Sequence, residues 1–198
     1  MSKNNNVPHG SLAADIFEWI EMIVLSACIV LLIFTFVARP AMVDGPSMDD
    51  TLHHKEMLII SDVFYEPKRG DIVVFQKINS SHSAPIVKRV IATEGEEITL
   101  IDSPDSEYEF NVIIKDKNGV AKVLEEPYAK WTTDQIVGFK ESDYPIKLEE
   151  GQLFVMGDNR NHSLDSRDSV NIGIVDEKEI IGKVVIRTLP IKKFGKVN

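Results

Sequence analysis

The run Pro85-Ile86-Val87-Lys88-Arg89-Val90-Ile91-Ala92 predicts a β-strand that carries a lysine among apolar residues. Alternate side chains of a strand share one face, so Lys88 lies on the same face as Ile86 and Val90. If that face is buried, the ammonium group of Lys88 loses its hydration and its pKa falls. The alternative is a strand lysine that points to water, which is the commoner arrangement for a lysine considered alone.

A buried lysine can act as a base only at a cost in free energy. A lysine with an ordinary pKa of about 10.4 is only about 0.04% neutral at pH 7. A pKa of about 7–8 requires roughly 3–5 kcal/mol of ammonium destabilisation, which burial has to supply. Lys88 therefore indicates a catalytic base only if a nucleophile lies close to it.

Short β-branched runs separated by turn residues continue on both sides of this strand. The further candidate strands are 57–60, 71–75, 98–101, 112–114, 120–123, 153–156 and 180–186. Between two of them, the Asn118-Gly119 step predicts a hairpin. Residues from about 102 to 150 are richer in charge and turns, and we interpret them as an inserted region or second lobe. The fold class that we expect is mostly β.

The apolar run Met22–Val37 contains no charged residue and predicts a membrane anchor. Its helix would span about 24 Å, and residues 19–21 with Ala38 extend it to about the 30 Å of a hydrocarbon core. A cleaved secretory signal is the alternative, but such signals follow positive charges, whereas the preceding residues here are acidic. We expect a leader over 1–18, an anchor over 19–38 and a further domain over 39–198.

Composition limits the partners and cofactors. A net charge of −9 argues against nucleic-acid binding, which requires a basic surface. The single cysteine, Cys28, excludes an intrachain disulfide, and no Cys/His cluster has the spacing of zinc ligands. We therefore expect no metal and no organic cofactor.

Two further segments offer chemistry. Gly45-Pro46-Ser47 follows the anchor closely and predicts a turn that presents the Ser47 hydroxyl. A serine and a lysine together can form a hydrolytic dyad without histidine, and backbone N–H groups at such a turn can stabilise an oxyanion. The polar loop 157–167 is dense in side-chain donors and acceptors, as expected either of a loop that supports a site or of a solvated turn.

In this order, these segments resemble the bacterial type I signal peptidases of the short, Gram-positive-like form. The matching parts are the anchor and the segments 45–52, 69–75, 88–91, 157–167 and 180–185. The resemblance covers nearly all of the chain after the acidic leader. It implies an antiparallel β core with an inserted β-rich region of about 102–150, preceded by one transmembrane helix.

The resemblance also implies roles for single residues. Ser47 is similar to the family nucleophile, Lys88 to its general base and Ser163 to the serine that orients the lysine. The ion pairs that would support the loop are Asp165 with Arg167 and Asp158 with Arg89. The residues that would line the shallow pockets for small side chains are Met48, Leu52, Ile86 and Val87. Asp50 stands where the family often has proline, and Gly45 where some members have a serine, so we expect the oxyanion to be held by the Ser47 backbone N–H.

The function that the resemblance implies is that of a membrane-anchored serine endopeptidase. It would remove signal peptides from exported preproteins through an acyl-enzyme and cleave after small-x-small motifs. Its partners would be preproteins and the lipid bilayer, with the amino terminus in the cytoplasm and the catalytic domain on the outer face. Basic residues on both sides of the anchor leave the orientation open by charge alone.

Three alternatives compete with this function. A Ser–His enzyme would use His53, His54 or His162, although none of them occupies the Lys88 position. A self-cleaving Ser/Lys repressor would need a DNA-binding segment where this chain has an apolar run. A non-catalytic, anchored β domain that binds partners at the cell surface would tolerate replacement of Ser47 and Lys88.

Overall fold

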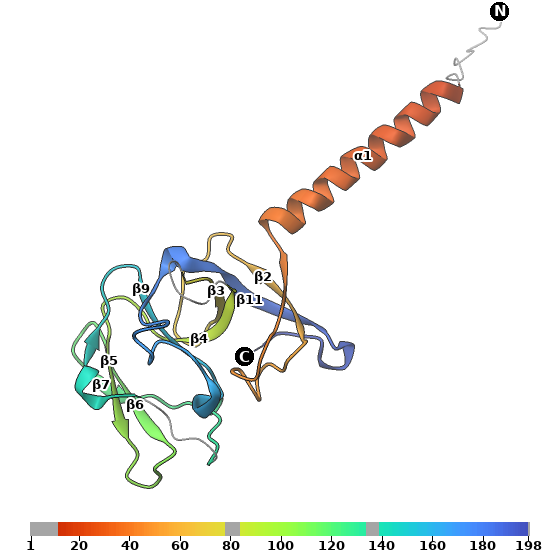
Figure 1. Cartoon of the computed structure of the whole chain (residues 1–198). Helices are drawn as coiled ribbons and strands as arrows, with labels where there is room; N and C mark the ends of the chain where they lie inside the picture. The colour runs from red at the N-terminus through yellow and green to blue at the C-terminus, as the bar shows by residue number, and fades with distance from the viewer. Residues whose placement is uncertain (1–11, 78–83, 134–138, 198) are drawn as a thin grey trace, which may run out of the picture. The chain divides into compact units, whose positions relative to one another are not determined.

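The computed structural model describes residues 12–77, 84–133 and 139–197 of the 198-residue chain. These residues form two compact units, one that ends at Ala38 and one that begins at Arg39. The first unit is built on the helix α1 (Leu12–Phe36). The second contains the β-strands (Figure 1).

Helix α1 contains a stretch, Ala14–Thr35, that is long and apolar enough to cross a bilayer. The stretch has 22 residues and a mean hydropathy of 2.4. At a rise of 1.5 Å per residue it is about 33 Å long, close to the thickness of a hydrocarbon core. The helix begins at Leu12, so Asp15 and Glu18 of the expected leader belong to its first turns.

The second unit holds two antiparallel sheets, and the expected mostly β, antiparallel fold is confirmed. The larger sheet has the order β1-β2-β11-β3-β4-β9-β10. Its strands are β1 (Arg39–Met42), β2 (Met57–Ser61), β3 (Ile72–Phe75), β4 (Ile86–Ala92), β9 (Gln152–Met156), β10 (Val175–Asp176) and β11 (Ile180–Leu189). The smaller sheet consists of β7 (Ala121–Val123), β6 (Phe110–Lys115), β5 (Glu97–Asp102) and β8 (Ile146–Lys147), in that order. Short 3-10 helices lie at Glu141–Asp143 (η1), Arg160–His162 (η2), Glu177–Glu179 (η3) and Ile191–Lys193 (η4).

The smaller sheet corresponds to the region that the sequence marks as charged and rich in turns. It also includes β5, which lies largely ahead of residue 102. The predicted hairpin joins β6 to β7, and Gly119 adopts the positive φ of +84° that its turn requires. Every run that the sequence predicts as a strand forms one, whereas β1, β8 and β10 were not predicted.

Side-chain alternation places β3 and β4 in the centre of the core. Ile72 and Val74 of β3 pack into one apolar cluster, and Val73 and Phe75 pack into a second cluster on the other face. The next strand, β4, contributes Val90 to the second cluster and continues into a third, which covers the smaller sheet. Each such fully buried side chain contributes about 1.5–3 kcal/mol. A lysine on β4 is therefore surrounded by core.

Candidate active site

Ser47 lies in a turn that apolar side chains fasten to the core. Gly45 begins the turn with a φ of +92°, a value that favours glycine. After Ser47, the N–H of Leu52 donates to the carbonyl of Met48 at 2.8 Å, which closes a helical turn. Both side chains are buried in the first apolar cluster, Met48 at 1% and Leu52 at 0% exposure. The half-buried Ser47 is therefore held at a fixed place on the core surface.

Lys88 reaches this turn from β4. Its side chain is only 2% exposed and shares a sheet face with the fully buried Val73 and Val90, so the alternative of a lysine that points to water does not hold. The Nζ atom lies 2.7 Å from Ser47 Oγ and 3.0 Å from the Val87 carbonyl, and it donates to both. Burial lowers the pKa of Lys88 to about 8. About a tenth of Lys88 is then neutral at pH 7, and in that fraction Ser47 Oγ–H can donate to Nζ.

Asp165 and Arg167 form a buried ion pair in the loop next to Lys88. Arg167 Nε and Nη2 each donate to the carboxylate at 2.7 Å, and the Gly157 N–H donates to it at 3.0 Å. Burial raises the pKa of Asp165, but the charge and hydrogen bonds of Arg167 outweigh burial, so the net pKa lies below its ordinary value. At Lys88, Asp165 raises the pKa and Arg167 lowers it, so burial remains the dominant cause of the shift.

Ser163 is the residue that the resemblance assigns to orienting the lysine. In the part of the chain that the structure describes, Lys88 Nζ bonds to Ser47 and Val87 and not to Ser163. Ser163 nevertheless lies close by, because a Cβ placed on Gly157 would be 2.2 Å from Ser163 Oγ and 2.4 Å from the Ser47 carbonyl oxygen. Its orienting role stays a prediction.

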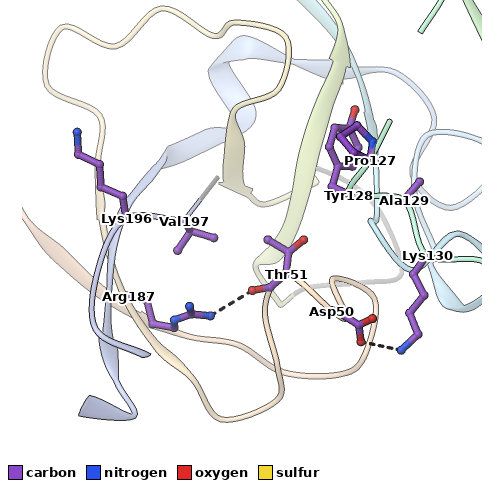
Figure 2. A pocket seen from close by; sticks show the side chains of 9 residues that line it. All are labelled: Asp50, Thr51, Pro127, Tyr128, Ala129, Lys130, Arg187, Lys196 and Val197. Atoms are coloured by element: carbon purple, nitrogen blue, oxygen red, sulfur yellow. Dashed lines mark hydrogen bonds and ion pairs between the residues drawn. The ribbon is translucent and has the colours of Figure 1, made fainter. Parts of the chain in front are cut away.

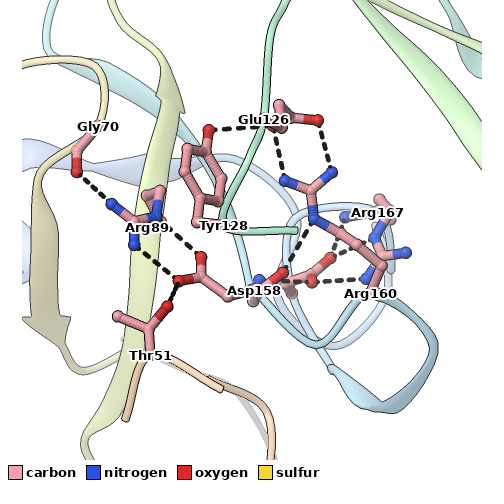
Figure 3. A network of polar contacts seen from close by, with 10 residues as sticks. Thr51, Gly70, Arg89, Glu126, Tyr128, Asp158, Arg160 and Arg167 are labelled. Carbon is pink, nitrogen blue, oxygen red and sulfur yellow. Dashed lines mark hydrogen bonds and ion pairs between the residues drawn. The ribbon is translucent and has the colours of Figure 1, made fainter. Parts of the chain in front are cut away.

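A second buried ion pair connects the lysine strand, the loop and the serine turn (Figure 3). Arg89 Nε and Nη2 donate to Asp158 at 2.8 and 2.7 Å, with side-chain exposures of 3% and 0%. Arg89 also donates to the Gly70 carbonyl at 2.8 Å. From the serine turn, Thr51 Oγ1 donates to Asp158 at 2.5 Å. The pair expected from the sequence is present, but the part of Thr51 was not foreseen.

Asn159 holds the serine turn through two hydrogen bonds and was also missed by the sequence interpretation. Its backbone N–H donates to the Ser47 carbonyl at 3.1 Å, and its Nδ2 donates to the Pro46 carbonyl at 3.2 Å. Asn159 is buried in the polar loop directly after β9. That position, an amide at the end of a buried strand, is the signal that could have identified it.

The Ser47 N–H is one of the backbone N–H groups of the serine turn that have no acceptor among the described residues. Within the described ranges, the Ser47 N–H donates to no other group, whereas the Gly45 N–H donates to His54 Nδ1 at 3.2 Å. The other neighbouring histidine, His53, contacts Asp49 at 2.8 Å. Lys88, and neither of these two histidines, is therefore the group within hydrogen-bond distance of Ser47 Oγ.

The four predicted pocket residues divide between two clusters. Met48 and Leu52 belong to the first apolar cluster, with Val87 packed against it, whereas Ile86 packs against the second. Alongside them, one edge of β4 is open. Ile86–Arg89 pairs with β3, but β9 joins the other edge only from Arg89 onward, so no described strand pairs there with residues 86–88.

A cleft of about 850 Å³ adjoins the serine turn (Figure 2). It is lined by Asp50, Thr51, Pro127, Tyr128, Ala129, Lys130, Arg187, Lys196 and Val197. Across it, Lys130 of the inserted region forms an exposed ion pair with Asp50 at 2.8 Å. The carboxylate that Asp50 adds to the cleft is therefore paired with the ammonium group of Lys130. Among the described residues, no group of three or more His, Cys, Asp or Glu side chains could hold a metal ion.

Comparison with known proteins identifies similar sequences along most of the chain. The family described as signal peptidase, peptidase S26, matches residues 16–189. Signal peptidase I of Bacillus licheniformis is 35% identical over 191 residues, which cover 93% of this chain and 94% of that one. Signal peptidase IB of Staphylococcus aureus (strain COL) is 31% identical over 195 residues, with 91% and 93% covered. The crystal structure of a signal peptidase I from Enterococcus faecalis aligns at 24% identity and a TM-score of 0.39, covering 61% of this chain and 98% of that one.

Proposed function

Because this chain belongs to the signal peptidase S26 family, we propose that it removes signal peptides from exported preproteins with Ser47 and Lys88 as its catalytic dyad. Signal peptide removal by a serine protease is the activity of the family. The observation that carries the dyad is the 2.7 Å contact between Lys88 Nζ and Ser47 Oγ, made by a lysine that is 2% exposed. The two groups have the contact and the protonation balance that a nucleophile and its base need.

The mechanism is acyl transfer. Neutral Lys88 accepts the proton of Ser47 Oγ–H while the oxygen attacks the scissile carbonyl carbon, and the Ser47 N–H donates to the oxyanion that forms. Protonated Lys88 then gives its proton to the leaving amine, which departs with the mature protein. In the second half, Lys88 takes a proton from water as the water oxygen attacks the ester carbonyl carbon. The bond to Ser47 Oγ then breaks, Lys88 returns the proton to Ser47 Oγ, and the signal peptide leaves with a free carboxyl group.

The substrate chain binds as an added strand. The open edge of β4 at residues 86–88 offers backbone donors and acceptors next to Lys88, which favours an extended peptide. Met48 and Leu52 already fill the core beside the nucleophile, so the space left for a substrate side chain is shallow. A bulky side chain would clash there, which supports cleavage after small-x-small motifs.

Helix α1 anchors the enzyme in the bilayer in this proposal. Proteins of this family are membrane-associated, and the Ala14–Thr35 stretch has the length and hydropathy of a single span. The amino terminus lies in the cytoplasm and the unit from Arg39 onward on the outer face, where preproteins emerge. Confinement to the same membrane raises the effective concentration of enzyme around membrane-bound signal peptides.

The dyad is tested first at Ser47. Wild-type protein in liposomes is expected to convert a purified preprotein to its mature form, and Ser47→Ala is expected to lower the rate by at least about 10⁴-fold, because no other nucleophile replaces the hydroxyl. Ser142→Ala, at an exposed serine of the inserted region, is the matched control and should cleave like the wild type. Full cleavage by Ser47→Ala would rule out the dyad. Absence of cleavage by the wild type would favour a non-catalytic binding domain.

A pH profile tests the base. With a Lys88 pKa of about 8, kcat/KM is expected to rise about tenfold per pH unit up to pH 7.5 and to level off above pH 8.5. The sign follows from the role, because only the neutral amine accepts a proton and its fraction grows with pH. At pH 7 that fraction is about 10%, against about 0.04% for an ordinary lysine. An inflection near pH 6.5 would instead indicate a histidine base.

A further inference from the structure

One segment of the inserted region, residues 126–132, runs alongside the polar loop that follows β9. We call it the support segment. The Lys130 N–H donates to the Asp158 carbonyl at 2.7 Å, and the Arg160 N–H donates to the Lys130 carbonyl at 3.0 Å. These two bonds form a parallel bridge between Lys130 and Asn159. The smaller lobe is therefore joined to the loop by backbone hydrogen bonds.

The bridge shares a residue, Asn159, with the hydrogen bonds that hold the serine turn. Asn159 is the residue between the two bonds, and it is also the residue that donates to the carbonyls of Ser47 and Pro46. The order of contacts is thus support segment, Asn159, serine turn. A displacement of the support segment is therefore transmitted to the Ser47 backbone through Asn159, in addition to the exposed ion pair between Lys130 and Asp50.

Glu126 adds a charged contact to this bridge (Figure 3). Its two carboxylate oxygens accept from Arg160 Nη1 and Nη2 at 2.7 and 2.6 Å, a bidentate geometry. Arg160 Nε donates at 3.0 Å to the carbonyl of Gly157, the residue against which Ser163 and the Ser47 carbonyl are packed. Through the Arg160 guanidinium group, Glu126 therefore helps to hold Gly157, which packs closely against Ser163 and the Ser47 carbonyl.

The ion pair between Glu126 and Arg160 is buried, so water cannot take the place of Glu126 if its charge is removed. The side chains of Arg160 and Glu126 are 0% and 8% exposed. Burial lowers the pKa of Arg160, but the hydrogen bonds and charge of Glu126 outweigh it, so the guanidinium remains charged. Without Glu126 this charge would stand unpaired beside the rings of Phe110 and Trp131, whose centroids lie 5.8 and 5.7 Å from it. An unpaired buried charge is strongly destabilising, so Arg160 would have to move and release the Gly157 carbonyl.

The same segment also contacts the ion pair beside Lys88. Tyr128 donates its hydroxyl to Glu126 at 3.1 Å, and its ring centroid lies 4.0 Å from Arg89 Cζ. Arg89 follows Lys88 on β4 and holds Asp158. The support segment therefore contacts the neighbours of both members of the dyad.

We propose that the support segment is a positioning element of the active site and that Glu126 is its principal positioning residue. By holding Arg160, Glu126 keeps loop 157–161 against the serine turn and so keeps Ser47 Oγ within reach of Lys88. The inference rests on the proposed function, because its effect is measured as preprotein cleavage. In this proposal the inserted region contributes to turnover, although it lies far from Ser47 in the sequence.

The test compares Glu126→Gln with Glu125→Gln in the full-length protein in liposomes. Glu126→Gln keeps the shape and removes the charge. Glu125 is the matched control because it is exposed and forms no hydrogen bond or ion pair with the described residues. Active sites are counted with a peptide boronate that binds the reactive serine, and kcat is expressed per titrated site. We expect kcat per site to fall about 10- to 100-fold in Glu126→Gln, with KM within about threefold and the control unchanged, because small misplacements of reacting groups have effects of this size.

A merely structural role gives a different result. Glu126→Gln would then lower only the fraction of protein that titrates, while the surviving sites would turn over at the wild-type rate, and this outcome would overturn the proposal. If Glu126→Gln does not fold, Glu126→Asp, which keeps the charge and shortens the reach, is measured in the same way and is expected to show the same loss per site. Cleavage by the wild type with an unaffected Glu126→Gln defeats this inference alone, whereas an inactive wild type defeats the proposed function.

Discussion

Replacing Lys88 by methionine is expected to abolish preprotein cleavage and to make the protein more stable. Methionine has a similar length and no charge, so it removes the base while filling the same volume. We expect kcat to fall by at least about 10⁴-fold, as when one member of a catalytic dyad or triad is removed. The double variant with Ser47→Ala should be no less active than either single variant, because the two groups act as one unit.

The gain in stability follows from the lowered pKa of Lys88. The folded protein binds this proton with a pKa of about 8, against about 10.5 for a free lysine. Between these two pH values the unfolded chain binds more protons, so wild-type stability rises with pH across this window. Below pH 8 the full cost of the buried ammonium is present, about 3 kcal/mol at 1.36 kcal/mol per pH unit. Loss of the hydrogen bond to Ser47 offsets about 1 kcal/mol of the gain.

Urea unfolding in detergent solution measures this effect. Lys88→Met is expected to exceed the wild type by about 2–3 kcal/mol at pH 7 and to lose that advantage as the pH approaches 10.5. Lys122→Met, at an exposed lysine of β7, is the matched control and should show no gain. A variant that is less stable than the wild type at pH 7 would show that the ammonium is well solvated or well paired, and the proposed base would lose its physical basis.

Gly157→Ala is expected to inactivate the enzyme without touching any reacting atom. The added Cβ would lie 2.2 Å from Ser163 Oγ and 2.4 Å from the Ser47 carbonyl oxygen, distances that real Cβ atoms do not adopt. The Ser47 carbonyl is backbone and is held by Asn159, so the serine turn or the loop has to move. We expect kcat to fall by at least about 100-fold, and overpacking to lower the free energy of unfolding by about 1–3 kcal/mol.

A second glycine separates the two effects. Gly119→Ala introduces strain at a φ of +84° in the β6–β7 hairpin, but its Cβ meets nothing within 4 Å. It is expected to lower stability by about 1 kcal/mol and to leave kcat unchanged. Similar kcat values for Gly157→Ala and the wild type would mean that the serine turn tolerates displacement, which contradicts the tight packing at this position.

Local pattern was sufficient to predict the central strands and the face that Lys88 shares with Val90, but it did not decide whether that face is buried. Strand alternation requires that Lys88 share a face with Val90, and both side chains are buried in the structure. Strand β1 escaped prediction because it contains Pro40, which lacks the N–H of a paired strand and is tolerated here because β1 is at the edge of the sheet. Strands β8 and β10 have two residues each, too few for an alternation to be visible.

The support of the site was harder to predict because it depends on contacts between distant segments. Glu126 stands in a charged stretch that looks like solvated surface, and its partner Arg160 is 34 residues away. Thr51 and Asn159 likewise gain their roles only when the serine turn meets the loop after β9. Family resemblance indicated the pairs Asp165–Arg167 and Asp158–Arg89, which are present, but it did not indicate what holds the loop from the side of the inserted region.

Strand β9 pairs with β4 only from Arg89 onward, and this limits the length of the open edge beside Lys88. The edge of β4 is open over residues 86–88, about 10 Å of extended chain, and then closes where β9 pairs with Arg89. A polypeptide that added to this edge could pair with β4 only as far as Lys88, because β9 occupies the edge from Arg89 onward. If preproteins add to this edge as proposed, the residues before the scissile bond would have to fit this short open stretch, whatever the sequence further upstream.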